Sequence, residues 1–273
     1  MSFSIEGKTA IVTGAANGVG LAIARHFVDQ GANVMFADMD EGRLCDELGE
    51  ANGDGGRGTA RAFAGDLRER LTIANLLSAT IDAFERVDIL VNACRQMVPS
   101  DPLDPDNDAV QMLLEQNLMT SLRLSQTVAK RMIKQVEDIE PDERPSTIGS
   151  IINLSSIAAR RTHPELLGYS VSTAALDQMT RSLAVALAPH RIRVNGVSFG
   201  SVLSNSLKGA LKQNADYRTN IRDHTPMHRI AKPGEVAEAA QFLASDAAAF
   251  MTGQIMTVDG GRTLLDPVSA PAH

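Results

Sequence analysis

A glycine-rich turn near the start of the chain has the residue types that bind a phosphate group. It reads Thr13-Gly14-Ala15-Ala16-Asn17-Gly18-Val19-Gly20, with an apolar run before it and the helical run Leu21-Ala22-Ile23-Ala24 after it. Glycines permit a tight turn and a close approach of the backbone to pyrophosphate, and the N-terminus of the following helix favours negative charge. We therefore predict a dinucleotide site at Gly14, Asn17, Gly18, Val19 and Gly20, with a purely structural turn as the alternative.

An acidic residue follows the glycine turn at the spacing that a dinucleotide site needs. Asp38 closes the second predicted strand, 18 residues beyond Gly20, where a carboxylate can accept hydrogen bonds from the adenosine ribose hydroxyls. A 2′-phosphate would meet a like charge there, and neither Ala15-Ala16 nor Met39 supplies a cation to attract it. The sequence predicts NAD rather than NADP as the cofactor, unless Asp38 is only a solvated acid at a strand end.

The elements that must position these residues follow from the pattern of apolar residues. Short β-branched runs alternate with longer segments of helical periodicity, which is typical of βαβ units. The predicted fold is α/β, a single Rossmann-type domain over residues 1–273 with a doubly wound, seven-stranded parallel sheet flanked by helices. The predicted strands are 9–13, 33–37, 60–64, 88–92, 150–154, 193–198 and 254–258. The predicted helices are 19–30, 42–50, 69–85, 108–136, 169–188 and 233–244.

Composition and charge exclude several classes of function. Hydrophobic residues make up 44% of the chain, enough for a large core, whereas aromatic residues make up 4%, without tryptophan, too few for a base-stacking surface. A net charge of -7 repels nucleic acid phosphates and anionic lipids, so we expect no nucleic acid and no membrane partner. Cys45 and Cys94 lack a metal-ligand spacing, and we expect no metal. No signal peptide or apolar membrane span is present, which predicts a cytoplasmic protein.

From Lys8 to Gly261 the chain resembles the short-chain dehydrogenase/reductase family. The family pattern of Thr-Gly, three residues, Gly, one residue, Gly is met in the glycine turn. Asn92-Ala93 resembles the Asn-Ala-Gly that follows the fourth strand, with Cys94 in place of the glycine. The resemblance further implies an Asn117 that helps to hold a water in the proton relay. By the same resemblance the remaining cofactor-binding residues are Asp66, Leu67, Asn92, Ala93, Tyr169 and Gly200.

The resemblance also implies a catalytic pair of hydroxyl groups, Ser156 and Tyr169, thirteen residues apart. Hydride transfer at an alcohol or carbonyl carbon needs a proton moved at the oxygen, which a tyrosine can do while a serine steadies the same oxygen. Ser155 is the competing serine, and the spacing to Tyr169 favours Ser156. Tyr169 as a merely packed aromatic residue stays open as an alternative.

The chain departs from the family motif of Tyr, three residues, Lys, because Thr173 stands at the lysine position. That lysine binds the nicotinamide ribose and makes the tyrosine more acidic. Lowering a tyrosine pKa from about 10 to about 7.5 takes roughly 3.4 kcal/mol, which a cation about 4 to 5 Å away supplies at an effective dielectric of about 20. Threonine carries no charge. In addition, Phe199-Gly200 replaces the usual Pro-Gly at the carboxamide contact.

A compensating charge can come from the loop between Ser156 and Tyr169, which holds Arg160, Arg161 and His163. Loop charges of this kind are more often merely solvated. His224 and His228 lie in the segment 201–228, which we predict to be a substrate lid, and a surface role is the expectation for both.

The predicted function is NAD-dependent hydride transfer between the nicotinamide and a secondary alcohol or ketone, with an atypical site. One alternative is a catalytically silent NAD(H)-binding protein with a regulatory role, and another is an isomerase or dehydratase without net redox change. The substrate is not encoded in any motif. Family resemblance implies a homo-oligomer, a dimer or a homotetramer, and the tail 264–273 is expected to lie across a neighbour or to be disordered.

Overall fold

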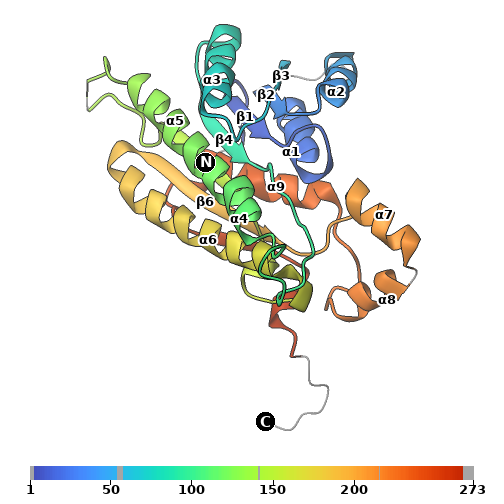
Figure 1. Ribbon diagram of the computed structural model, residues 1–273. Helices are drawn as coiled ribbons and strands as arrows, with labels where there is room; N and C mark the ends of the chain where they lie inside the picture. The colour runs from blue at the N-terminus through green and yellow to red at the C-terminus, as the bar shows by residue number, and fades with distance from the viewer. Residues whose placement is uncertain (1–2, 54–57, 141, 215, 267–273) are drawn as a thin grey trace.

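Seven parallel strands form one sheet in the computed structural model, which describes residues 3–53, 58–140, 142–214 and 216–266 (Figure 1). Their order is β3-β2-β1-β4-β5-β6-β7. The chain thus reverses its direction of winding between β1 and β4, which makes the carboxyl ends of these strands the place where a ligand binds in such sheets. The prediction of a doubly wound, seven-stranded Rossmann sheet is confirmed. The strands are β1 Thr9–Thr13, β2 Asn33–Asp38, β3 Ala60–Ala64, β4 Ile89–Asn92, β5 Gly149–Ser156, β6 Ile192–Phe199 and β7 Ile255–Val258.

Alternate residues of each strand enter two separate cores, one on each face of the sheet. In β5, Ile152 belongs to the core that contains Phe27 of the first helix, whereas Ile151 belongs to the core that contains Leu124 of the fifth. Both strand residues are fully buried. Burial on both faces explains why the strands are apolar on successive residues.

The two faces are covered by different helices (Figure 1). The first core is completed by α1 and α9, and the second by α3, α5 and α6. The predicted helices match the observed ones closely except for 108–136, which is divided by a π-helical turn at Leu114–Met119. The observed helices are α1 Gly18–Asp29, α2 Glu41–Gly53, α3 Arg70–Phe84, α4 Val110–Leu113, α5 Thr120–Lys134, α6 Leu167–Leu187, α7 Asn205–Gln213, α8 Asp216–Asp223 and α9 Pro233–Ala244.

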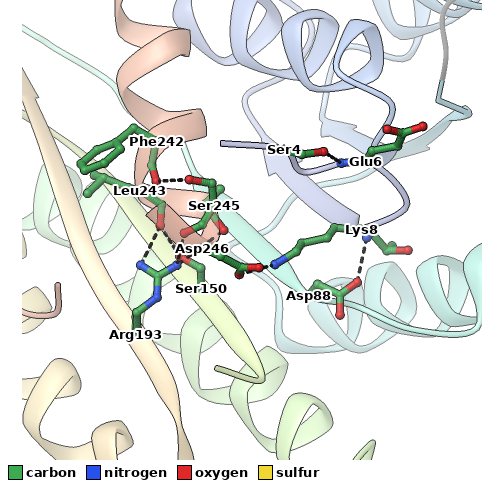
Figure 2. Close-up of polar contacts among 12 residues, drawn as sticks. Ser4, Glu6, Lys8, Asp88, Ser150, Arg193, Phe242, Leu243, Ser245 and Asp246 are labelled. Atoms are coloured by element: carbon green, nitrogen blue, oxygen red, sulfur yellow. Dashed lines mark hydrogen bonds and ion pairs between the residues drawn. The ribbon is translucent and has the colours of Figure 1, made fainter. Parts of the chain in front are cut away.

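The amino ends of the strands are closed by polar contacts (Figure 2). The buried Arg193 of β6 donates to the carbonyl oxygen of Leu243 at the end of α9, at 2.7 Å, and Lys8 pairs with Asp246 at 3.0 Å. A cavity of about 670 Å³ opens at this edge beside Asp88 and Ser150. None of the predicted site residues lines this cavity; they lie toward the opposite edge of the sheet, at the carboxyl ends of the strands.

Candidate active site

The glycine turn lies against the end of β4, and its conformation depends on the absence of side chains. Gly14 has a φ of +65°, and a Cβ there would lie 2.9 Å from the carbonyl oxygen of Ala93. The Thr13 hydroxyl accepts hydrogen bonds from the backbone N–H groups of Ala93 and Cys94, at 3.0 and 3.1 Å. Asn17 precedes α1 without a side-chain cap, so its side chain leaves the N–H groups of the first helical turn available to a ligand. This cradle fits a pyrophosphate.

Asp38 is fixed beside this turn by backbone donors. Its Oδ2 accepts from the Ala16 N–H at 3.1 Å, and its Oδ1 accepts from the N–H groups of Met39 and Asp40 at 2.8 and 3.2 Å. The carboxylate therefore ends β2 at the glycine turn, as the ribose-binding prediction requires. Val19, another predicted cofactor-binding residue of this turn, is buried in α1.

The pair Asp66 and Leu67 follows β3 at the same edge of the sheet. Leu67 is buried, whereas the Asp66 carboxylate bonds with the guanidinium of Arg68, whose Nε lies 2.9 and 3.0 Å from the two carboxylate oxygens. The Arg68 guanidinium holds the pKa of Asp66 below its usual value. Arg68 is a cation that the sequence analysis did not consider at the adenosine end, and Asp66 neutralises it.

Asn92 and Ala93, the other predicted cofactor residues at this edge, play different parts. The Asn92 side chain is buried behind the sheet, where its Nδ2 donates to Asn153 Oδ1 at 2.8 Å and to Ser125 Oγ at 3.1 Å. Ala93 instead presents its backbone to Thr13. Only the backbone at these positions borders the glycine turn.

The predicted hydroxyl pair lies at the carboxyl end of β5 and in the first turn of α6. Ser156 Oγ accepts from the Ala158 N–H at 3.1 Å, and Tyr169 is 4% exposed. Ser155 has no exposed surface and lies beside Asp177 of α6, whose pKa is raised by burial. Ser156 therefore has the better access to a substrate oxygen of the two serines.

Asn117 lies in the π-helical turn and joins two segments of the site. Its Oδ1 accepts from the Gln96 N–H at 2.8 Å, and its Nδ2 donates to the Gln96 carbonyl at 2.9 Å and to Ser172 Oγ at 3.1 Å. The segment that leaves β4 is thus tied to α6 next to Tyr169.

Thr173, one turn beyond Tyr169, directs its hydroxyl into its own helix. The oxygen lies 2.8 Å from the Tyr169 carbonyl and 3.2 Å from the Ser170 carbonyl, and the side chain is 1% exposed. Its single donor is therefore used within α6.

The Tyr169 hydroxyl is contacted by a cation that the sequence analysis missed. Arg95, just after β4, donates from Nη1 to the Tyr169 hydroxyl at 2.5 Å and to the Ser155 carbonyl at 3.3 Å. Its guanidinium carbon lies 4.1 Å from the centroid of the Phe199 ring. An arginine placed after the carboxyl end of a central strand was the available signal.

Comparison with known proteins gives the family. The family model described as enoyl-(acyl carrier protein) reductase matches residues 14–263. The 7alpha-hydroxysteroid dehydrogenase of Escherichia coli strain K12 is 32% identical over 260 residues, which cover 94% of each chain. The chain belongs to the short-chain dehydrogenase/reductase family. General oxidoreductase function is shared by these relatives.

Two further relatives of this family are similar over almost their whole length. Cis-4-hydroxycyclohexanecarboxylate dehydrogenase of Sinomonas cyclohexanicum is 35% identical over 257 residues, which cover 94% of this chain and 96% of that one. A solved 7 alpha-hydroxysteroid dehydrogenase, complexed with NADH and 7-oxo glycochenodeoxycholic acid, superposes with a TM-score of 0.85 at 32% identity and 95% coverage of each chain. The fold is that of short-chain dehydrogenases/reductases.

The loop between Ser156 and Tyr169, named as one possible source of a compensating charge, does not contact the Tyr169 hydroxyl among the described residues. Arg160 and His163 are exposed, and Arg161 donates to the Thr263 carbonyl. Among the described residues, none of these three hydrogen bonds with Tyr169; Arg95 does. The contact between Arg95 and Tyr169 joins residues 74 positions apart, so no pattern in the chain next to the tyrosine predicts it.

Phe199 and Gly200 end β6 at the expected carboxamide contact. Phe199 is buried with its ring against Arg95, and the Gly200 N–H donates to the Val258 carbonyl at 3.2 Å. The aromatic ring at the usual proline position therefore serves Arg95 as a packing surface.

The predicted lid, 201–228, contains α7 and α8, which stand apart from the sheet (Figure 1). Ser204, which caps α7, lies near the glycine turn, with its Cβ 3.9 Å from the place of a Cβ on Gly18. His224 and His228 are exposed, as expected. No metal-binding cluster and no membrane-spanning helix occur among the described residues. Of the predicted tail, residues 267–273 lie outside the described ranges.

Proposed function

We propose that this protein is an NAD(H)-linked oxidoreductase that interconverts a secondary alcohol and the corresponding ketone. The observation that carries the proposal is the shared edge of the sheet: the glycine turn with its bound Asp38 and the buried Tyr169 hydroxyl lie at the carboxyl ends of the strands. A dinucleotide and a proton-transferring group are what hydride transfer at a carbinol carbon requires.

NAD is the proposed cofactor rather than NADP. The carboxylate of Asp38 accepts hydrogen bonds from three backbone N–H groups, which fix its position beside the glycine turn, where it can accept from ribose hydroxyls. A 2′-phosphate would be repelled by it. Arg68, which follows β3, is paired with Asp66.

Each protein group has a defined task in this proposal. The bound dinucleotide supplies the hydride acceptor or donor. Tyr169 takes the alcohol proton during oxidation and returns it during reduction, and Ser156 hydrogen bonds with the same substrate oxygen. Asn117 holds the segment after β4 against α6, which keeps the Tyr169 region in place.

Ring alcohols are the first substrates to test. Two relatives are named for a hydroxyl group on a ring, a hydroxysteroid and a hydroxycyclohexanecarboxylate. We expect NADH formation with members of such a panel and NAD⁺, measured by nicotinamide absorbance. Tyr169→Phe should lower kcat by about 10² to 10⁴, the usual worth of general acid–base catalysis. Turnover by no alcohol or ketone in the panel, with NADH still bound, would instead favour the second function below.

A catalytically silent NAD(H)-binding protein is the second candidate. The observation in its favour is Thr173, which brings no charge and turns its hydroxyl into the helix. This candidate predicts cofactor binding without net consumption of NAD(H).

We also propose that the protein is a homo-oligomer and that 201–228 covers the substrate. Leu167, Val171 and Val185 are exposed apolar residues on one face of α6, the helix that family resemblance places at subunit contacts. For the lid, the position of Ser204 beside Gly18 puts the start of α7 over the glycine turn.

A further inference from the structure

We propose that Arg95 supplies Tyr169 with the positive charge that the missing active-site lysine would otherwise provide. The inference rests on the proposed function, in which Tyr169 transfers the proton. The guanidinium reaches the hydroxyl oxygen itself, at 2.5 Å, so it contacts the atom on which negative charge develops. A charge-assisted hydrogen bond of this kind is stronger than a neutral one.

The guanidinium has no competing anion. Among the described residues, no carboxylate lies within ion-pair distance of Arg95. Its hydrogen bonds go to a neutral hydroxyl and a carbonyl, although the side chain is half-buried. A half-buried cation without a counter-ion is placed to pair with the negative charge that develops on the Tyr169 oxygen during proton transfer.

The position of Arg95 is fixed from both sides. The two preceding residues donate to Thr13, and the following residue, Gln96, forms two hydrogen bonds with Asn117. The flat guanidinium also stacks on the Phe199 ring at 4.1 Å, a cation–π contact. Thr173, at the usual lysine position, brings no charge to Tyr169, whereas Arg95 does, and the Phe199 ring at the usual proline position packs against the Arg95 guanidinium.

The titratable groups next to Arg95 in the chain, farther along α6 and in the loop after β5 do not take this role. The Cys94 thiol is neutral at physiological pH because burial raises its pKa to about 11. Asp177, two turns along α6 from Tyr169, has a carboxyl group, which cannot supply a positive charge; burial raises its pKa. Arg160, in the loop between β5 and α6, is exposed to solvent.

Protons and electrons are balanced in the proposed oxidation. The substrate O–H bond breaks and its proton passes to the Tyr169 phenolate, while the carbinol C–H bond breaks and its electron pair leaves as hydride to the oxidised nicotinamide. The products are a ketone, the reduced dinucleotide and neutral Tyr169. Arg95 keeps all its protons throughout, since a guanidinium is not deprotonated in this pH range.

The first test follows kcat for alcohol oxidation against pH. Arg95→Gln should lower kcat at neutral pH by about 10² or more and move the rising limb about one pH unit or more upward. Arg95→Lys, which keeps the charge, should retain most of the activity. Arg181→Gln is the matched control, because Arg181 is an exposed arginine of α6, the helix that carries Tyr169. This variant should leave the pH profile of kcat unchanged.

A second test places a lysine at position 173 of α6, where the family has one. Thr173→Lys in the Arg95→Gln background should recover activity at neutral pH, whereas Thr173→Lys alone should give no gain because Arg95 already supplies the cation. A gain of about tenfold or more from Thr173→Lys alone would overturn the proposal. So would an Arg95→Gln variant that changes KM alone, because the arginine would then bind the substrate and not act through the tyrosine.

A direct titration needs no turnover. The chain has two tyrosines and no tryptophan, and the second tyrosine, Tyr217, is 50% exposed. In a Tyr217→Phe background the ultraviolet band of tyrosinate reports on Tyr169 alone. Arg95→Gln should move tyrosinate formation to higher pH, and an unchanged midpoint would contradict the proposal.

The two proposals fail in different ways. If no substrate is turned over but the tyrosinate band shifts as expected, the proposed function fails while Arg95 still acts on Tyr169. If substrate is turned over and Arg95→Gln changes neither kcat nor the band, the Arg95 proposal fails alone.

Discussion

Asp38 has three backbone donors on its carboxylate, so its charge is well placed to select the cofactor. We expect the protein to bind NADH about 10- to 100-fold more tightly than NADPH, which is the worth of one or two charged hydrogen bonds. Asp38→Ala should narrow the gap, since both the ribose acceptor and the repulsive charge are lost. Titration of nicotinamide fluorescence measures both affinities. Equal affinities in the unmodified protein would exclude this role for Asp38.

Cys94, which follows β4 beside the glycine turn, provides a second test of the candidate site. Burial, with a contribution from the charge of Asp38, raises the pKa of its thiol to about 11. Because the thiolate is the reactive form, alkylation of Cys94 should be very slow at neutral pH and should accelerate about tenfold per pH unit up to about pH 11. A Cys45→Ser variant leaves Cys94 as the reporter, and mass spectrometry gives the rate. Fast labelling at neutral pH would refute a buried, neutral thiol; Cys45, which is exposed, is the internal standard in the unmodified protein.

At the scale of single residues, local motifs predicted where the glycine turn, Asp38, Ser156 and Tyr169 lie, because each follows directly from the end of a strand or the start of a helix. Arg95 was not predicted. Its partner is far away in the sequence, and no local pattern states which side chain meets the tyrosine. The hydrogen bonding of Thr173 within α6 also required the folded helix.

Among the elements, α1 shows most clearly how packing positions the glycine turn of the predicted cofactor site. A Cβ at Gly20 would lie 2.2 Å from the Gly14 carbonyl oxygen, so Gly20→Ala must push the helix away from the turn. We expect a loss of about 1 to 3 kcal/mol in the free energy of unfolding, together with weaker NADH binding. The matched control is Gly42→Ala, where the nearest atom would be 3.8 Å away and the change should stay within about 0.5 kcal/mol. Urea unfolding and NADH titration measure both effects; unchanged NADH affinity in Gly20→Ala would show that the close approach is not needed.

The strands and most helices were predicted because their apolar periodicity is strong and two cores require it. The division of the predicted helix 108–136 into α4, a π-helical turn and α5 was not predicted. Residues 108–136 contain neither glycine nor proline after Asp108, so nothing in the sequence marks the π-helical turn that carries Asn117. The helices α7 and α8 were missed because their sequences are largely polar.

For the whole molecule, the exposed apolar face of α6 predicts self-association. Val185 is 78% exposed, and Phe250 is fully exposed. Val185→Arg should convert an oligomer to a smaller species at micromolar concentration, because a charge in an apolar contact is costly to bury. Leu71→Arg, at a residue of α3 that is 73% exposed, is the control and should leave the assembly intact. Sedimentation velocity distinguishes the outcomes, and a monomeric unmodified protein would contradict the prediction.

The strand order has a consequence for how the chain is made. β1 is synthesised first yet lies inside the sheet, between β2 and β4. A ribosome that has released only the first three strands therefore presents a nascent half-sheet in which one edge of β1 is unpaired and its apolar residues are uncovered. From Ile89 onward, each new strand adds beside the previous one, so that the sheet lengthens in a single direction until β7. The interval before β4 emerges is when the nascent chain is most exposed to aggregation and when a chaperone would protect it most.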